Sequence, residues 1–343
     1  MGTHFGLGIF LALLGGLLNG SFYAPAKKMP LWRWENTWLI YSLSGTIVMP
    51  WVLALATIPN LMTVYHETPW PTLILVFLFG LGWGIGSVFF GLGVAMVGIA
   101  LAYGIILGII ASVGAIIPIL VKDPSQFWTP QGHALLAGLA LVILGTIFCA
   151  VAGHQRDKDK KAAATAAASA AGASFVLGFI ICVLSGIFSP MLNFSFEFGK
   201  GLQDRSLAAG APFSMASYSI WAIALIAGFS ANAAYCVYLL FKNKTWGVYR
   251  TSGAPASYWL LGALMGILWF GGIAAYGMGA TELGNLGAAV GWPLFVATNI
   301  ITGNVWGAVT GEWTGAGRRA FTFAGAGIAV LILAIFVIAH GSA

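Results

Sequence analysis

Two aromatic faces recur in the sequence at helical spacing and could bind a flat ligand surface. Trp83, Ser87 and Phe90 lie at positions i, i+4 and i+7, which places them on one face of a helix. Trp269 and Tyr276 repeat that spacing 186 residues later. Aromatic rings stack on the C–H surface of a sugar, and hydroxyls bond its oxygens. These faces therefore predict a saccharide-binding surface, with packing or lipid-facing aromatic side chains as the alternative.

Amide and phenol side chains inside apolar runs extend this set. An amide in hydrocarbon needs a hydrogen-bonding partner, so each one faces protein or water. Helix–helix hydrogen bonding is the alternative to ligand binding at each position. Pro190 predicts a helix break beside one of these amides. The candidates for substrate binding are Asn19, Tyr23, Trp83, Phe90, Tyr103, Asn193, Trp269, Tyr276, Trp292 and Asn299.

Acidic side chains are the groups that could carry a proton across a membrane. The chain has nine, and none is expected at the middle of an apolar run. Surface placement is the favoured interpretation for each of them. The candidates for proton coupling are Glu35, Glu197 and Glu282.

Enzyme and nucleic-acid functions find no support in the sequence. The five His residues are scattered, the three Cys residues lie in apolar runs, and neither type shows metal-ligand spacing. No nucleophile has a credible base nearby. The pI of about 9.3 comes from Lys and Arg in short loops and not from a recognition helix. We therefore expect no catalytic residue, metal, cofactor or nucleic-acid partner.

The composition is that of a chain embedded in lipid. Hydrophobic residues make up 59% of the 343 residues and charged residues only 7%. A spanning helix needs about 20 apolar residues, and ten such segments can be drawn. They cover residues 5–24, 37–58, 72–95, 98–121, 133–152, 174–196, 214–241, 257–279, 285–310 and 319–340. Gly98 and Gly284 mark tight hairpins between the third and fourth and between the eighth and ninth segments.

The loops divide the basic residues unequally between the two sides of the membrane. Twelve of the 15 Lys and Arg residues fall in loops on one side, and Lys122, Lys200 and Arg205 fall on the other. Basic residues favour the cytoplasm, so both termini are expected in the periplasm. The polar stretch 153–172 is predicted to be a cytoplasmic linker between two five-helix repeats, residues 1–152 and 173–343.

Internal similarity supports that division. A shift of 186 residues places Gly80, Trp83 and Gly86 on Gly266, Trp269 and Gly272, and Gly91, Gly93 and Gly98 on Gly277, Gly279 and Gly284. A shift of 170 places Gly16 on Gly186. Because each half has five spans, the second half enters from the opposite side. The sequence thus predicts an all-α polytopic membrane protein with ten transmembrane helices in two inverted repeats.

Several longer motifs agree with one known family. GGLLNGSFYAPAKKMPLWRWENTW (15–38), MPW (49–51), IPN (58–60) and EWTGAGRR (312–319) resemble the bacterial L-rhamnose–proton symporters, with matching spacing along nearly the whole chain. The resemblance implies a fold of the drug/metabolite transporter superfamily in the bacterial inner membrane. It also implies alternating-access import of a small sugar, L-rhamnose first, with a proton.

Alternatives to that function remain open from the sequence. The stretch 281–299 lacks acidic and aromatic residues associated with rhamnose carriers, so a carrier or exporter of a different sugar or metabolite on the same fold is the main alternative. A channel and a membrane enzyme acting on a lipid-linked sugar are two others. The expected partners are the sugar, the proton and the lipid bilayer. The sequence does not decide whether the chain forms a homo-oligomer.

Overall fold

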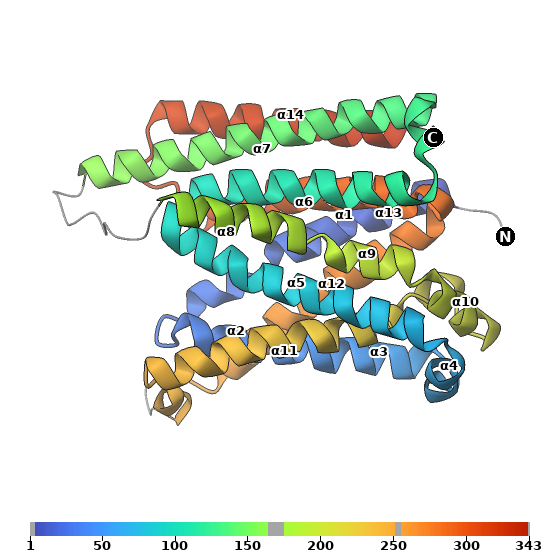
Figure 1. Cartoon of the computed structure of the whole chain (residues 1–343). Helices are drawn as coiled ribbons and strands as arrows, with labels where there is room; N and C mark the ends of the chain where they lie inside the picture. Colours follow the sequence, from blue (N-terminus) through green and yellow to red (C-terminus); the bar gives the residue numbers. More distant parts are fainter. Residues whose placement is uncertain (1–3, 164–174, 251–254, 342–343) are drawn as a thin grey trace.

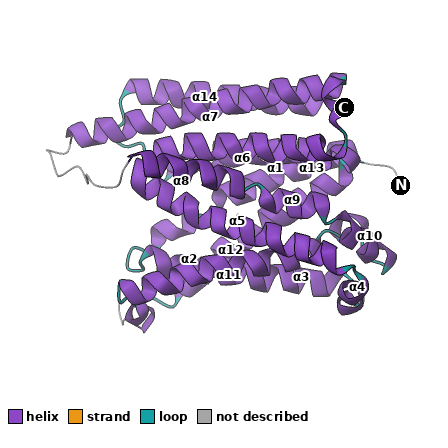
Figure 2. Ribbon diagram, viewed as in Figure 1, coloured by secondary structure: helices purple, strands orange, loops and turns teal. Residues whose placement is uncertain are grey.

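The computed structural model describes residues 4–163, 175–250 and 255–341, and these residues form a helical bundle (Figure 1, Figure 2). Within those ranges ten helical segments are long and apolar enough to cross a membrane, and no strand is present. Each coincides with one of the ten predicted segments. Helices satisfy their backbone hydrogen bonds internally, which is what an apolar run requires in lipid.

The first half of the chain supplies five of these segments. Its helical elements, some of them short 3₁₀ or π turns, are α1 (Phe5–Ser21), η1 (Ala24–Lys28), α2 (Trp34–Ser42), η2 (Leu43–Val48), α3 (Met49–Thr57), α4 (Leu61–Glu67), α5 (Trp70–Val97), α6 (Ile99–Lys122), η3 (Pro124–Trp128) and α7 (Pro130–Ala163). The second span is therefore continuous through α2, η2 and α3.

The second half supplies the other five. Its elements are α8 (Phe175–Phe188), α9 (Met191–Phe198), α10 (Lys200–Ala208), η4 (Phe213–Met215), α11 (Tyr218–Lys242), η5 (Trp246–Arg250), α12 (Ser257–Glu282), η6 (Gly284–Leu286), α13 (Gly287–Val309) and α14 (Arg318–Gly341). The sixth span is divided at Ser189–Pro190 into α8 and α9, as Pro190 predicted, since proline has no N–H to continue the helix.

The two predicted hairpin glycines occupy conformations that other residues rarely adopt. Gly98 has φ of 86° and joins α5 to α6, and Gly284 has φ of 70° and begins the turn between α12 and α13. A residue with a Cβ would be strained at these angles. The tight connection between consecutive spans therefore depends on glycine at both places.

The α7 helix is longer than its apolar run. It continues through the charged segment to Ala163, so residues 153–163 of the predicted linker are helical, while 164–172 lie outside the described residues. Arg156 forms an ion pair with Glu312 at 3.3 Å, and the Asp159 carboxylate accepts a hydrogen bond from the Gly317 N–H at 2.8 Å. These contacts with the α13–α14 loop hold the charged turns in helical form.

Helices from the two halves are interleaved. Among the described residues, α1 packs against α12 and α13, whereas α5 packs against α8 and α11. The α7–α14 pair lies along one side of the bundle, and α2, α3 and α11 lie along the opposite side (Figure 1). The core between these two layers is thus built from both halves of the chain.

Glycine allows the closest helix contacts in this core. A Cβ built on Gly80 of α5 would lie 2.0 Å from the Ala224 carbonyl oxygen of α11. A Cβ on Gly84 would lie 2.5 Å from the Gly228 carbonyl oxygen, one turn further along the same pair. Small residues let membrane helices approach until their backbones touch.

We expect Gly80→Ala to lower the unfolding temperature of the purified protein by several degrees, because α5 and α11 must separate to admit the methyl group. Gly325→Ala is the matched control, since nothing lies within 4 Å of a Cβ on that mid-helix glycine of α14. Thermal unfolding in detergent, followed by size-exclusion chromatography, measures both. Equal unfolding temperatures for wild type and Gly80→Ala would contradict the close packing of α5 on α11.

Candidate functional site

The tryptophans that correspond between the two halves meet in the middle of the bundle. The ring centroids of Trp83 (α5) and Trp269 (α12) are 5.0 Å apart with an interplanar angle of 31°. Tyr41 of α2 meets Trp269 edge-on at 6.1 Å. Trp269 is buried and Trp83 is half-buried. Trp83 therefore keeps one part of its ring accessible beside a fixed aromatic partner.

A chain of amides runs past this tryptophan pair. The Asn299 amide donates to the Asn19 side-chain oxygen at 2.7 Å, and the Asn19 amide donates to the Trp269 backbone carbonyl at 3.2 Å. Asn19 is buried, whereas Asn299 is half-buried. These bonds join α1, α12 and α13, and they leave part of the Asn299 amide accessible to a hydrogen-bonding ligand.

A second amide node lies on the α11 side of the same region. The Asn232 side-chain oxygen accepts from the Trp38 indole N–H at 3.0 Å and from the Ser87 hydroxyl at 3.1 Å. Trp38 also stacks on Trp34 at 4.9 Å. Trp38 and Asn232 were not among the sequence candidates. Trp34 and Trp38 are four residues apart, which places both on one face of a helix, and this spacing could have identified Trp38.

Three candidates lie toward one end of the bundle and keep part of their surface exposed. Tyr103 of α6 is 42% exposed. Phe90 packs edge-on against Tyr103 at 5.0 Å. Tyr23 is 44% exposed. Glu312, which pairs with Lys27 at the same end, is a residue that the sequence analysis did not propose.

This end, which we call the Lys27 end, carries an ion cluster. Glu312 pairs with Lys27 of η1 and with Arg156 of α7. The Arg156 guanidinium also lies over the Trp313 ring, 5.5 Å from its centroid. The cluster connects η1, α7 and the α13–α14 loop.

The remaining three candidates lie in closed packing toward the other end. Tyr276 donates a hydrogen bond to the Asn193 side-chain oxygen, and Asn193 donates to the Gly114 carbonyl at 2.8 Å. Trp292 meets Tyr276 edge-on at 5.3 Å and donates its indole N–H to the Ile110 carbonyl at 2.9 Å. All three candidates are buried. The ten candidates thus form a partly exposed layer, a middle layer and a fully packed layer, which we call the closed layer.

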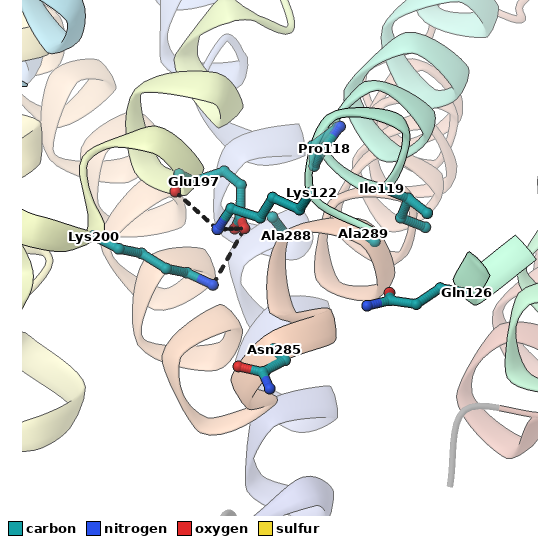
Figure 3. A pocket seen from close by; sticks show the side chains of 9 residues that line it. All are labelled: Pro118, Ile119, Lys122, Gln126, Glu197, Lys200, Asn285, Ala288 and Ala289. Atoms are coloured by element: carbon teal, nitrogen blue, oxygen red, sulfur yellow. Dashed lines mark hydrogen bonds and ion pairs between the residues drawn. The ribbon is translucent and has the colours of Figure 1, made fainter. Parts of the chain in front are cut away.

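A small pocket lies at this closed end, which we call the Glu197 end. Its volume is about 130 Å³, and its polar lining comes from α6, η3, α9, α10 and η6 (Figure 3). Glu197 is 2% exposed, and one of its carboxylate oxygens pairs with Lys122 and with Lys200, the latter at 3.2 Å. The other oxygen is buried and has no hydrogen-bond partner among the described residues. Lys122 belongs to the first half and Glu197 to the second.

Glu35 is held by neutral groups at the Lys27 end. Its carboxylate accepts from the Asn243 amide at 3.0 Å and from the Thr245 hydroxyl at 2.8 Å. Nearby, the Tyr249 hydroxyl donates to the Asn36 carbonyl at 3.0 Å. Burial raises the pKa of Tyr249 to about 12, so this hydroxyl remains a donor at physiological pH. Glu35 therefore anchors the start of α2 to the chain after α11.

Surface placement was the wrong expectation for these carboxylates. Glu35, Glu197 and Glu282 are 4%, 2% and 5% exposed, respectively. One oxygen of Glu282 is buried without a hydrogen-bond partner in the described structure. The sequence placed all three near helix ends correctly, but neighbouring helices cover those ends.

Comparison with known proteins identifies the family. The family model described as "L-rhamnose-proton symport protein" matches residues 1–343. The chain belongs to the L-rhamnose-proton symport family. An L-rhamnose-proton symporter of Klebsiella pneumoniae subsp. pneumoniae is 28% identical over 98% of both chains, and one of Escherichia coli O17:K52:H18 is 27% identical over 98% of both. This family consists of transporters, so the chain is not an enzyme.

A solved structure shares the fold of this symport-family chain. It is titled only "Crystal structure of protein", and it has a TM-score of 0.55 with 16% identity, covering 96% of this chain and 95% of that one. This likeness concerns the fold alone. The amides and aromatic rings described above belong to this symport-family sequence.

We expect Asn193→Leu to lower the unfolding temperature more than Tyr276→Phe. The first change leaves the Tyr276 hydroxyl and the Gly114 carbonyl without a partner, whereas the second removes only one donor. Each buried polar group left without a hydrogen bond lowers the free energy of unfolding by about 1–3 kcal/mol. Unfolding temperatures of the two purified variants measure the difference, and the reverse order would show that the Asn193 amide is not the centre of this bonding.

Proposed function

We propose that this chain imports L-rhamnose together with protons across the bacterial inner membrane. The family match over the whole chain is the observation that carries this proposal. Ten apolar spans support a multi-pass membrane location. The alternative weighed from the sequence, a carrier or exporter of another sugar or metabolite, is not favoured by the family match or by the curated relatives.

The sugar site in this proposal lies between the two halves, beside Trp83 and Trp269. The accessible part of Trp83 stacks on the C–H face of the sugar, and Asn299 bonds a hydroxyl. Tyr23, Phe90 and Tyr103 line the route from this site to the Lys27 end. The support is their partial exposure, in contrast with the buried Tyr276 and its neighbours. Such apolar walls with a few polar groups are typical of small-molecule sites.

Inverted repeats explain why the middle of the bundle is built from both halves. Several close contacts in one half have a counterpart in the other half, and the two sequence shifts relate the residues of each contact to those of its counterpart. Residues of α5 and α6 are related by the shift of 186, and residues of α1 by the shift of 170. The related contacts are Gly86–Ser189 with Gly272–Asn19, Gly93–Cys182 with Gly279–Ala12, and Gly186–Ile109 with Gly16–Phe295. Five spans per half place such related elements in opposite orientations, which supports alternating access by rocking of the halves.

We place the Lys27 end in the cytoplasm and both termini in the periplasm. Loops toward the Lys27 end carry twelve of the 15 basic residues, and basic loops remain cytoplasmic. The helix α1 begins, and α14 ends, at the opposite end, where α10 lies (Figure 1). In this orientation the partly exposed candidates face the cytoplasm and the closed layer faces the periplasm, so we assign the structure to a state that is closed toward the periplasm.

Glu197 is the proton-coupling candidate that the geometry supports best. Its carboxylate is buried, it lines a pocket at the proposed periplasmic end, and Lys122 reaches it from the other half. Rocking of the halves would withdraw Lys122 and leave Lys200, from the same half, as the one remaining cation on the carboxylate, which favours uptake of a proton more than the present pair of lysines does. Glu35 lacks such a partner, since its bonds are to neutral Asn243 and Thr245. Glu282 remains a further candidate because one of its oxygens is unpartnered.

We expect purified protein in proteoliposomes to accumulate labelled L-rhamnose when the proton concentration is higher outside than inside. Without a gradient the label should only equilibrate. Liposomes without protein, and the same liposomes with a protonophore, are the controls. Absence of saturable uptake by correctly folded protein would reject L-rhamnose and favour another substrate of the same fold.

Glu197→Gln should lose gradient-driven accumulation while the carrier still exchanges labelled for unlabelled sugar across the membrane. The Gln amide keeps the size of the side chain but does not ionise, so it can neither take up the coupled proton nor form an ion pair with a lysine. Glu67→Gln is a control, because Glu67 is exposed at the end of α4. Accumulation by Glu197→Gln equal to wild type would assign proton coupling to another residue.

A further inference from the structure

Two hydrogen-bond donors in the closed layer have no partner among the described residues. They are the Trp221 indole N–H and the Ser217 hydroxyl, at the first turn of α11 and the residue before it. Both residues have 0% exposure. An unsatisfied buried donor costs about 1–3 kcal/mol, and such groups are rare unless they have a function. Two neighbouring ones therefore require an explanation.

Both donors lie beside Gly277 of α12, a residue that has no side chain. A Cβ built on Gly277 would lie 2.7 Å from the Trp221 indole nitrogen and 2.9 Å from the Ser217 hydroxyl oxygen. Gly277 directly follows Tyr276, a substrate-binding candidate. The other buried indole of this layer, Trp292, has its N–H satisfied by a backbone carbonyl. Unsatisfied donors are thus a property of this position and not of every tryptophan in the layer.

The face of the Trp221 ring is covered by another aromatic side chain. Phe196 of α9 stacks on it with a centroid separation of 5.7 Å and an interplanar angle of 15°. Phe196 is 1% exposed and also lies 6.0 Å from the Tyr276 ring. An aromatic face with two adjacent donors is the combination that binds a sugar, and Phe196 occupies the place where the sugar ring would stack.

The segment that carries Phe196 can move separately from the rest of its span. The Ser189–Pro190 break divides α9 from α8, and proline removes one of the hydrogen bonds that would make them a single helix. Glu197, the next residue, holds α9 to the end of α6 through Lys122. Opening toward the periplasm must separate these elements, and it would carry Phe196 away from Trp221.

We propose that Trp221 and Ser217 form a second sugar subsite, which is exposed in the periplasm-open state and is filled by Phe196 in the present one. The ligand class is a neutral monosaccharide, with its C–H face on Trp221 and hydroxyls accepting from the two donors. Tyr276 and Asn193 border the subsite on the side of the middle layer. The inference rests on the proposed sugar-carrier function and adds a binding site on the uptake side of it.

The test compares half-saturation concentrations for labelled L-rhamnose in the two directions of transport. Influx and efflux are measured in oriented membrane vesicles containing wild type, Trp221→Phe or Ser217→Ala. Each variant removes one donor and keeps the packing of the ring or the backbone. We expect the ratio of influx to efflux half-saturation to rise about two- to tenfold in each variant, the effect of one lost hydrogen bond.

Trp32→Phe is the matched control. The Trp32 indole N–H is also buried without a partner in the described structure, but its ring packs against Tyr249, Tyr258 and Trp259, in η5 and the first turn of α12 toward the Lys27 end. Its ratio should equal that of wild type. An unchanged ratio in both Trp221→Phe and Ser217→Ala would overturn the subsite and assign the two donors to a buried water. Absence of uptake by wild type would instead reject the proposed function, so the two failures are distinguishable.

Discussion

The absence of water inside the bilayer is the constraint on which the rest of this structure depends. A polar group within a span must find its partner in the protein, because lipid offers none. Asn19, Asn193 and Asn232 all meet this condition by bonding to other helices or to backbone carbonyls. These bonds fix the faces that the spans turn toward one another. The polar interior that results is also the only place where a hydrophilic solute could cross.

Glycine makes that interior compact and joins the two halves of the chain. At Gly84 and Gly228, and at Gly45 and Gly266, helices approach until backbone atoms would meet any added Cβ. These contacts pair α5 with α11 and the second span with α12. Each half therefore stabilises the other along the middle of the bundle, and neither half would bury its apolar faces alone.

The two ends of the bundle differ in packing although related residues occupy both. Phe90 corresponds to Tyr276 by the 186-residue shift, yet Phe90 is half-buried and Tyr276 is fully buried. Next to Phe90, the Tyr103 side chain is 42% exposed, whereas around Tyr276 four aromatic rings pack together. Such unequal environments for related residues are what alternating access requires, since a second state could exchange them. The Lys122–Glu197 contact strengthens the closed end in the present state.

The sequence alone determined the ten spans, the hairpins at Gly98 and Gly284, and the break at Pro190, because hydrophobic length and backbone restrictions are local properties. It also brought together Trp83 and Trp269 through their repeat spacing. Only the tertiary structure decided which candidates are open, which are closed, and that Glu35, Glu197 and Glu282 are buried. Those properties depend on neighbours distant in the chain, such as Lys122 for Glu197 and Phe196 for Trp221. The sequence pattern of one helix does not specify which other helix will pack against it.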